Sequence, residues 1–337
     1  MEGTEFIFWN WTVAVYLFVA GVSAGAFAVS AFAYLLGREK YQYIARIGAY
    51  VAPFPLIFGL LCLIYDLERP YLFWKLLVTF QAHSVMSLGS WLLVIFSLLS
   101  FLYFYLWLPE GFDVMAIFRL IPESWEKVGL VRVFKKNLFF RILGRAGLNK
   151  LRGAVGAVGI LVSLLVGIYT GILLGVVSAR PFWNNPVLPI LFLVSALKTG
   201  TSSICLIGYF FRGFGEGNLA QIEANKKVVH TIDLVLMVLS IIAILLFVFG
   251  LYSSPRGSVE AAGLIMGGQF TFLFWGLVVG VGTFFPLFLE LYEMIRASAA
   301  RHNPWLSAVV TLSVLAGGFI LRYVVVYAGQ ATQLAGL

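Results

Sequence analysis

The chain has 337 residues, of which 61% are hydrophobic and only 11% are charged, and its mean hydropathy is +0.97. Soluble domains carry about 25% charged residues, so this composition excludes a soluble globular protein and predicts an all-α integral membrane protein. The net charge of +8 does not point to nucleic acid, because the basic residues are spread over connecting segments rather than gathered in one arm or groove.

A membrane span needs about 20 apolar residues, and the sequence has eight such runs. They cover approximately residues 11–36, 44–65, 84–107, 154–178, 187–211, 229–252, 264–292 and 304–327. The N-terminal stretch MEGTEFIFWN lacks the basic region and the cleavage site of a signal peptide, so we expect the first run to be kept as a span. We therefore treat residues 1–337 as a single polytopic membrane domain.

The distribution of Lys and Arg predicts how the spans are oriented. Seventeen of the 23 lie in the connections that follow the first, third, fifth and seventh spans, nine of them within residues 108–152, and four lie in the other connections. Because basic loops stay in the cytoplasm, we expect both termini outside and a basic cytoplasmic loop at 108–152. Within that loop, LVRVFKKNLFFRILGR either lies on the inner surface as an amphipathic helix or only fixes the topology.

The cysteines and histidines argue against a metal or haem centre in this protein. Cys62 and Cys205 lie far apart within apolar runs and form no CxxC pair, so no iron–sulfur cluster or structural zinc is expected. His83, His230 and His302 all fall near span ends, so no pair can bracket a haem in mid-membrane. If the protein handles electrons, they pass to or from another subunit.

Three expected spans bring polar side chains to a similar depth near the outer surface. Tyr169 lies nine residues before Ser178, which is about 13 Å below the outer end of its span at about 1.5 Å per residue. Tyr16 lies in the outer half of the first span, and Asp66 lies at the outer end of the second. His83 opens the third span at the same face.

This set suits the chemistry of a lipid-soluble quinone. A quinone carbonyl accepts hydrogen bonds from a phenol or an imidazole, and quinol oxidation needs a nearby proton acceptor such as a carboxylate at the water boundary. Other interpretations stay open. Tyr16 is also explained as an interfacial aromatic, Asp66 as a cap or a partner of Arg69, and Tyr169 as a packed tyrosine bonded to a backbone carbonyl.

Four charged residues lie deeper, and burying each charge in a membrane span costs several kcal/mol. Lys198 and Arg322 fall in the outer half of their spans, whereas Asp233 and Glu290 fall towards the cytoplasmic end. These groups form either a proton path across the membrane or paired charges that hold helices together. No spacing rule separates the two interpretations.

Several segments together resemble the NrfD/polysulfide-reductase membrane-subunit family, the PsrC-like proteins, over nearly all eight spans. The segments are FWNWTVAVYLFVAGVSAGAF, YDLERPYLFWKLL, QAHSVMSLGSWLL and SARPFWNNPVLPILFLVSALKTG. The resemblance implies a quinone-binding membrane anchor of eight helices in bundles, which docks a [4Fe–4S] ferredoxin-like subunit. Through that subunit it implies a connection to a catalytic subunit, often a molybdopterin enzyme.

The same resemblance assigns roles to individual residues. Tyr169 matches the family's quinone-contacting tyrosine, and Asp66 stands where the polysulfide-reductase subunit has a Glu. Val13 and Tyr16 stand where that subunit has an Asn and a His, so the mode of binding differs in detail. Lys198 stands where a small polar residue is commoner.

The sequence therefore predicts a quinone-binding anchor subunit of a respiratory oxidoreductase in a prokaryotic inner (plasma) membrane. It would exchange electrons between menaquinone, or another quinone, and an iron–sulfur partner, with or without proton translocation. We expect the partner to dock on residues 66–83 and 178–186. The alternatives are a proton-linked secondary transporter, although no internal repeat is visible, and a purely structural anchor without quinone.

Overall fold

The computed structural model describes residues 9–37, 40–67, 69–108, 136–210, 219–253, 256–296 and 304–332. Within these ranges the regular elements are all helical, and eight helices are long and apolar enough to cross a membrane. The prediction of an all-α integral membrane fold with eight spans is therefore confirmed. His302 and residues 109–135 of the expected basic loop lie outside the described residues.

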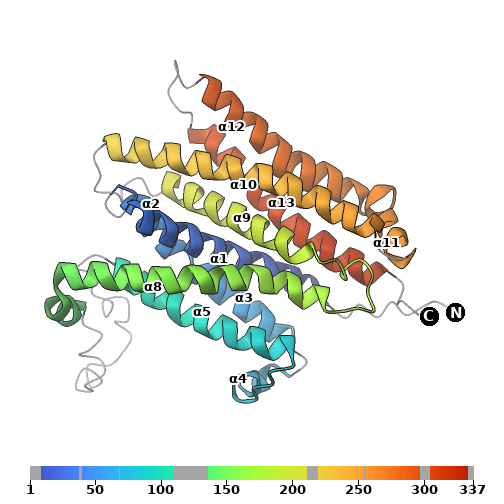
Figure 1. The fold of residues 1–337 in the computed structure, drawn as a ribbon, viewed down its shortest axis with the longest axis horizontal. Helices are drawn as coiled ribbons and strands as arrows, with labels where there is room; N and C mark the ends of the chain where they lie inside the picture. Colours follow the sequence, from blue (N-terminus) through green and yellow to red (C-terminus); the bar gives the residue numbers. More distant parts are fainter. Residues whose placement is uncertain are drawn as a thin grey trace.

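The chain folds in two halves. The first half contains α1 (Trp11–Gly37), α2 (Gln42–Val51), α3 (Pro53–Tyr65), η1 (Pro70–Leu72), α4 (Lys75–Val78), α5 (Val85–Trp107) and α8 (Lys136–Gly175). The second half contains α9 (Leu188–Phe210), α10 (Leu219–Ser253), α11 (Arg256–Met266), η4 (Phe272–Phe284), α12 (Phe285–Arg296) and α13 (Pro304–Ala331). Figure 1 shows the first half below and the second half above, with α1 and α9 adjoining in the middle.

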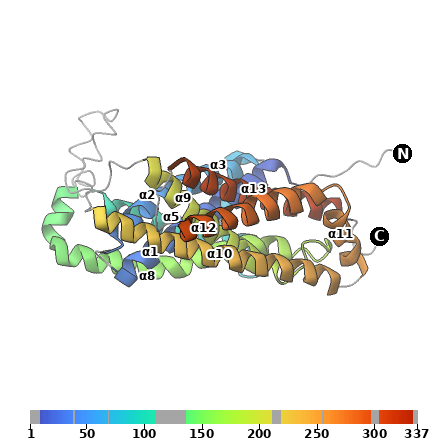
Figure 2. The same cartoon turned by 90° about the horizontal axis from the view of Figure 1, so that it is seen from above.

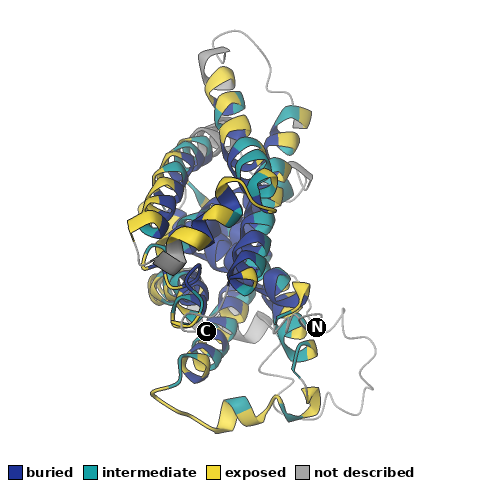
Figure 3. Cartoon of the chain, turned by 90° about the vertical axis from the view of Figure 1, so that its right-hand side faces the viewer, coloured by how far each residue is buried: buried dark blue, intermediate teal, exposed yellow. Residues whose placement is uncertain are grey.

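The start of α1 and the end of α13 lie at the same end of this elongated molecule, to the right in Figures 1 and 2, next to α11. This end is referred to below as the terminal end, and the opposite one as the far end. Viewed from the terminal end, buried residues gather along the centre and exposed residues face outward (Figure 3). The exposed positions include many large apolar side chains, as expected for helices that face lipid.

The two halves meet where α1 crosses α9. A Cβ atom added to Gly25 would overlap the backbone of Ala196, and one added to Gly200 would overlap the backbone of Gly25 and Ala26. Small residues allow helix backbones to approach this closely, as is common inside membranes. Because other helices surround α1, most of its residues are buried, and it carries Ala, Gly and Ser on all of its faces.

Two spans begin or bend differently from the sequence prediction. The span expected at 44–65 consists of α2 and α3, which meet at Ala52 because Pro53 has no amide hydrogen to continue the helix. The span expected at 154–178 belongs to a helix that begins at Lys136, within the expected loop, and ends at Gly175. That helix is interrupted at Gly144, whose φ of 63° is left-handed.

The seventh span departs furthest from the prediction. A single helix was expected over 264–292, but α11 ends at Met266 and the chain turns before it re-enters as η4. The turn is closed by backbone hydrogen bonds from Gly268 N to Gly263 O and from Phe270 N to Leu264 O, at 2.9 and 3.1 Å. η4 is a π-helix, a rare form that is frequent at functional sites, and it passes directly into α12.

Candidate functional site

Tyr169 projects from α8 onto α5, where its phenol lies directly over Gly89. A Cβ atom at Gly89 would overlap both the ring and the hydroxyl group of Tyr169, so only glycine leaves room for this side chain. Tyr169 is 9% exposed, and its hydroxyl makes no hydrogen bond to another group in the described ranges. The described ranges therefore contain no hydrogen bond from Tyr169 to a backbone carbonyl, which was the alternative interpretation of this residue. Its O–H is a donor that the described helices leave unused.

Tyr16 of α1 lies within electrostatic range of Tyr169 and is 2% exposed. Its ring packs against α3 at Gly59, whose added Cβ would lie 3.5 Å from Cδ2 of Tyr16. The hydroxyl of Tyr16 also makes no hydrogen bond within the part of the chain that the structure describes. Tyr16 is therefore more deeply buried than is typical of an aromatic residue in an interfacial belt. Two phenols from different helices thus lie within electrostatic range of each other.

Asp66 is connected to the same face of α1. It caps the C-terminus of α3, and its Oδ1 accepts a hydrogen bond of 2.7 Å from Oγ1 of Thr12. Thr12 precedes Tyr16 by four residues, and residues at this spacing lie above one another on a helix. Asp66 is partly buried. Because it is bonded to Thr12, it lies one helical turn closer to the terminal end than Tyr16, between the phenols and the aqueous side.

His83 lies apart from these three residues. It is exposed, in the segment between α4 and α5, and no contact joins it to Tyr16, Asp66 or Tyr169 in the described ranges. The neighbouring residues form the start of α5, where Oγ of Ser84 accepts from the N–H of Ser87 at 3.3 Å. The structure therefore places Tyr16 near Tyr169 and joins Asp66 to the helix that carries Tyr16, whereas His83 lies apart.

The corner at 178–186 holds the bundle together. Trp183 stacks on Trp9, with ring centroids 5.1 Å apart, and its Nε1 donates to the carbonyl of Val325 at 2.7 Å. Asn185 donates from Nδ2 to the carbonyl of Phe247 at 2.9 Å. These buried side chains connect the corner to α10 and α13, a role that no local sequence signal indicates.

Lys198 is bound by groups on two neighbouring helices. Its Nζ donates to Oγ of Ser240 at 3.3 Å, and to the Gly282 carbonyl and Oγ1 of Thr283 at 3.1 Å each. In an α-helix the Gly282 carbonyl would accept from the N–H of residue 286, which is a proline. Lys198 thus donates to a carbonyl oxygen that cannot accept an α-helical hydrogen bond from residue 286 of its own helix.

Arg322 is fully buried and bonds to neutral groups. Its guanidinium donates to Oγ of Ser195 and, at 3.1 and 3.2 Å, to the carbonyls of Gly318 and Phe192. It also lies over the Phe192 ring, 5.0 Å from the centroid. Neither Arg322 nor Lys198 forms an ion pair with a carboxylate among the residues with described side chains.

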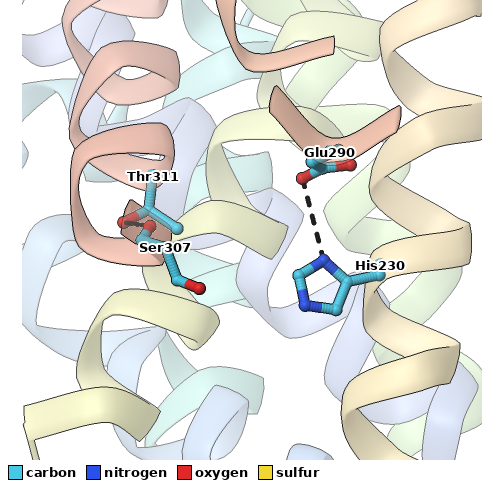
Figure 4. Close-up of polar contacts among 4 residues, drawn as sticks. All are labelled: His230, Glu290, Ser307 and Thr311. Carbon is cyan, nitrogen blue, oxygen red and sulfur yellow. Dashed lines mark hydrogen bonds and ion pairs between the residues drawn. The ribbon is translucent and has the colours of Figure 1, made fainter. Parts of the chain in front are cut away.

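Asp233 and Glu290 lie together near the far end, where both line the same pocket. Nδ1 of His230 lies 4.0 Å from Oε1 of Glu290, as the dashed line in Figure 4 shows. These residues line a small pocket that has room for about one water molecule. Its other lining residues are Cys205, Ser307, Val310 and Thr311.

The similarity of the whole sequence to known proteins identifies its family. The family model described as "Polysulphide reductase, NrfD" matches residues 2–335. The chain belongs to the NrfD family. The resemblance inferred from the sequence segments is thereby confirmed over nearly the whole length.

Relatives of known name align with this NrfD-family protein along its length. One of the chains of the polysulfide reductase of Wolinella succinogenes is 32% identical over 342 residues, covering 98% of the present sequence and 96% of that relative. Protein NrfD of Escherichia coli K12 is 33% identical, with 97% and 96% covered. One of the subunits of the selenate reductase of Mesobacillus selenatarsenatis is 26% identical and is covered over 74% of its length.

Family and fold together define the class of protein. A member of the NrfD family with eight apolar helices is a multi-pass membrane protein. No group of three or more His, Cys, Asp or Glu side chains in the described ranges could hold a metal ion. The outward orientation of both termini stays a prediction from the distribution of basic residues.

Proposed function

We propose that this NrfD-family protein is the quinone-binding membrane subunit of a respiratory oxidoreductase, and that Tyr169, Tyr16 and Asp66 form its quinone site. One observation carries the proposal: two buried tyrosines on different helices lie within electrostatic range of each other, and neither hydroxyl has a hydrogen-bond partner within the described ranges. A tyrosine inside a helix bundle normally finds a partner for its hydroxyl, so this pair fits a ligand that presents acceptors. Quinone carbonyls are such acceptors.

The arrangement supports a division of roles among the three residues. A bound quinone would supply a carrier of two electrons and two protons. Tyr169 and Tyr16 would donate hydrogen bonds that orient it between α1 and α8. Asp66, bonded to Thr12 one turn nearer the terminal end, would take or return a proton where the site meets water. His83, exposed at the same end, would lie on the route of that proton rather than against the ligand.

The names of the relatives support a multi-subunit complex, since two of them are named as parts of a polysulfide reductase and of a selenate reductase. We propose that electrons pass between the quinone and a [4Fe–4S] ferredoxin-like subunit, and from there to a catalytic subunit. The docking surface would be the segment at 69–83. It lies at the terminal end beside the site, and its exposed side chains include Tyr71, Trp74 and Phe80.

The test is to purify the native complex, identify its partners and assay bound quinone before and after Tyr169→Phe. Loss of one hydrogen bond predicts a quinone affinity about 2- to 10-fold weaker. Tyr103→Phe is the matched control, because Tyr103 is a buried tyrosine of the same half near the far end whose hydroxyl also has no hydrogen-bond partner in the described ranges. Unchanged quinone content in Tyr169→Phe would remove the named site.

The same purification separates the alternatives. Redox partners without any quinone would indicate a purely structural anchor. Absence of redox partners, together with solute uptake by the protein alone in proteoliposomes, would indicate a secondary transporter. In that case Lys198, Asp233, Glu290 and Arg322 would be reconsidered as a transport path.

A further inference from the structure

The pocket near the far end contains polar atoms that the protein does not satisfy. Oδ1 of Asp233 and Oγ of Ser307 are buried and have no hydrogen-bond partner within the described ranges. Both residues are more than nine-tenths buried and line the pocket with Glu290 and His230. Figure 4 shows the Ser307 hydroxyl on α13 directed towards the side where His230 and Glu290 lie. Buried polar groups left unsatisfied in this way indicate a missing ligand.

The charges around the pocket indicate what this ligand is. Two buried carboxyl groups that line one small pocket inside an apolar bundle do not both ionise readily, because like charges in one site repel and neither is solvated. A single proton on the pair removes one negative charge and supplies the donor that the Asp233 oxygen lacks. The pocket has room for about one water molecule, which the Ser307 hydroxyl and the carboxyl groups can bond.

Among the titratable residues that line this pocket, His230 is partly exposed at the surface. The side chain of His230 is 27% exposed, whereas that of Glu290 is 4% exposed. The distance of 4.0 Å between them exceeds a hydrogen bond, but one water in the pocket that both residues line can bridge it. Imidazole exchanges protons readily near neutral pH, so His230 is suited to pass protons between bulk water and the buried pair.

We infer that Asp233 and Glu290 form a binding site for one exchangeable proton, which a single water connects to His230 and thereby to the aqueous phase at the far end. The proton binds to one carboxylate and is hydrogen-bonded to the other. On release it passes through the water to the His230 imidazole, which delivers it to the aqueous phase. This site lies in the second half of the molecule and does not depend on a quinone at Tyr169.

The surroundings of the pair favour a proton over a second positive group. Lys198 on α9 interacts electrostatically with Asp233, but its Nζ is bonded to Ser240, Gly282 and Thr283 rather than to a carboxylate. Arg322 on α13 interacts electrostatically with Lys198 and bonds to neutral groups. From α9, Cys205 also faces both carboxyl groups, while the polar side chains that α13 gives to the pocket are the hydroxyls of Ser307 and Thr311.

The test is infrared spectroscopy of the purified protein with its native partners, which detects the C=O stretch of a protonated carboxylic acid. We expect a band that shifts in D2O and is lost in both Asp233→Asn and Glu290→Gln. Glu260→Gln is the matched control, because it alters an exposed carboxylate on α11. A band that persists in both pair variants, or is absent from the unaltered protein, would overturn the inference. A band that disappears on adding Na⁺ would indicate a cation site instead.

Two further variants keep the test independent of folding defects. Glu290→Asp retains both acids, so the band should move in frequency without being lost, and an unmoved band would contradict the assignment. His230→Phe should leave the band in place and slow its exchange with D2O at least 10-fold. Exchange at the original rate would remove His230 from the route. None of these measurements requires quinone turnover, so they succeed or fail separately from the quinone site.

Discussion

The phenol of Tyr169 on α8 occupies the space that a side chain at position 89 on α5 would fill. Gly89→Ala should therefore displace the phenol and lower the affinity for quinone by about the 2- to 10-fold expected for one lost hydrogen bond. The control is Gly263→Ala on α11, where an added Cβ meets nothing within 4 Å. Quinone binding measured on both variants should fall only in the first, and equal affinities would show that the position of Tyr169 does not matter.

Asp66→Asn tests the carboxylate as a proton acceptor. The amide keeps an oxygen that can accept the hydrogen bond from Thr12, so the junction between α1 and α3 should remain intact. Loss of the acid–base group should lower quinol-linked electron transfer by about 10²-fold or more while bound quinone is retained. Asp66→Glu should restore most of the rate. If the Asp66→Asn protein turns over at the normal rate, a group other than Asp66 accepts the proton.

Trp183→Phe should destabilise the protein through one buried carbonyl. It keeps an aromatic ring against Trp9 but removes the donor to Val325 O, leaving an unsatisfied group that costs about 1–3 kcal/mol. Thermal unfolding should show a lowered midpoint. Trp305→Phe, at a position that is 79% exposed on the same helix as Val325, should change it little. Equal midpoints for the two variants would refute this role.

Lys198 and Pro286 should be energetically coupled, although they do not bond to each other. Lys198→Met leaves the Gly282 carbonyl without its donor, which predicts a loss of about 1–3 kcal/mol. Pro286→Ala provides an N–H that an α-helix directs at that carbonyl, so Lys198→Met should be less harmful in that background. A double-mutant cycle of unfolding free energies measures the coupling, and strictly additive effects would contradict it.

The spans and several polar sites could be predicted from the sequence, whereas their partners could not. Hydropathy identifies eight spans because each needs its own apolar run, and it places Tyr16, Asp66 and Tyr169 at a common depth. The bond from Thr12 to Asp66 and the contact of Tyr169 with Gly89 join positions that are far apart in the sequence. No local pattern encodes them, because they depend on how whole helices pack.

The turn before η4 shows a second limit of prediction from the sequence. The run at 264–292 is mostly apolar, so hydropathy predicts one helix, but Gly267 and Gly268 permit a turn that apolar content does not reveal. The helix that follows is a π-helix, and the hydrogen bond of Lys198 to its Gly282 carbonyl could not be seen from the place of Lys198 in the sequence. The sequence located the buried charges without indicating which of them touch.

The crossing of α1 and α9 at Gly25 and Gly200 limits how the molecule can move. Transporters that open alternately to the two sides of a membrane tilt one half of the fold against the other. Here the two halves adjoin through backbone atoms in direct contact, with no layer of deformable side chains to absorb a tilt. The centre of the protein is therefore built as a fixed frame, which suits the proposed role of holding a quinone at constant distance from a redox partner.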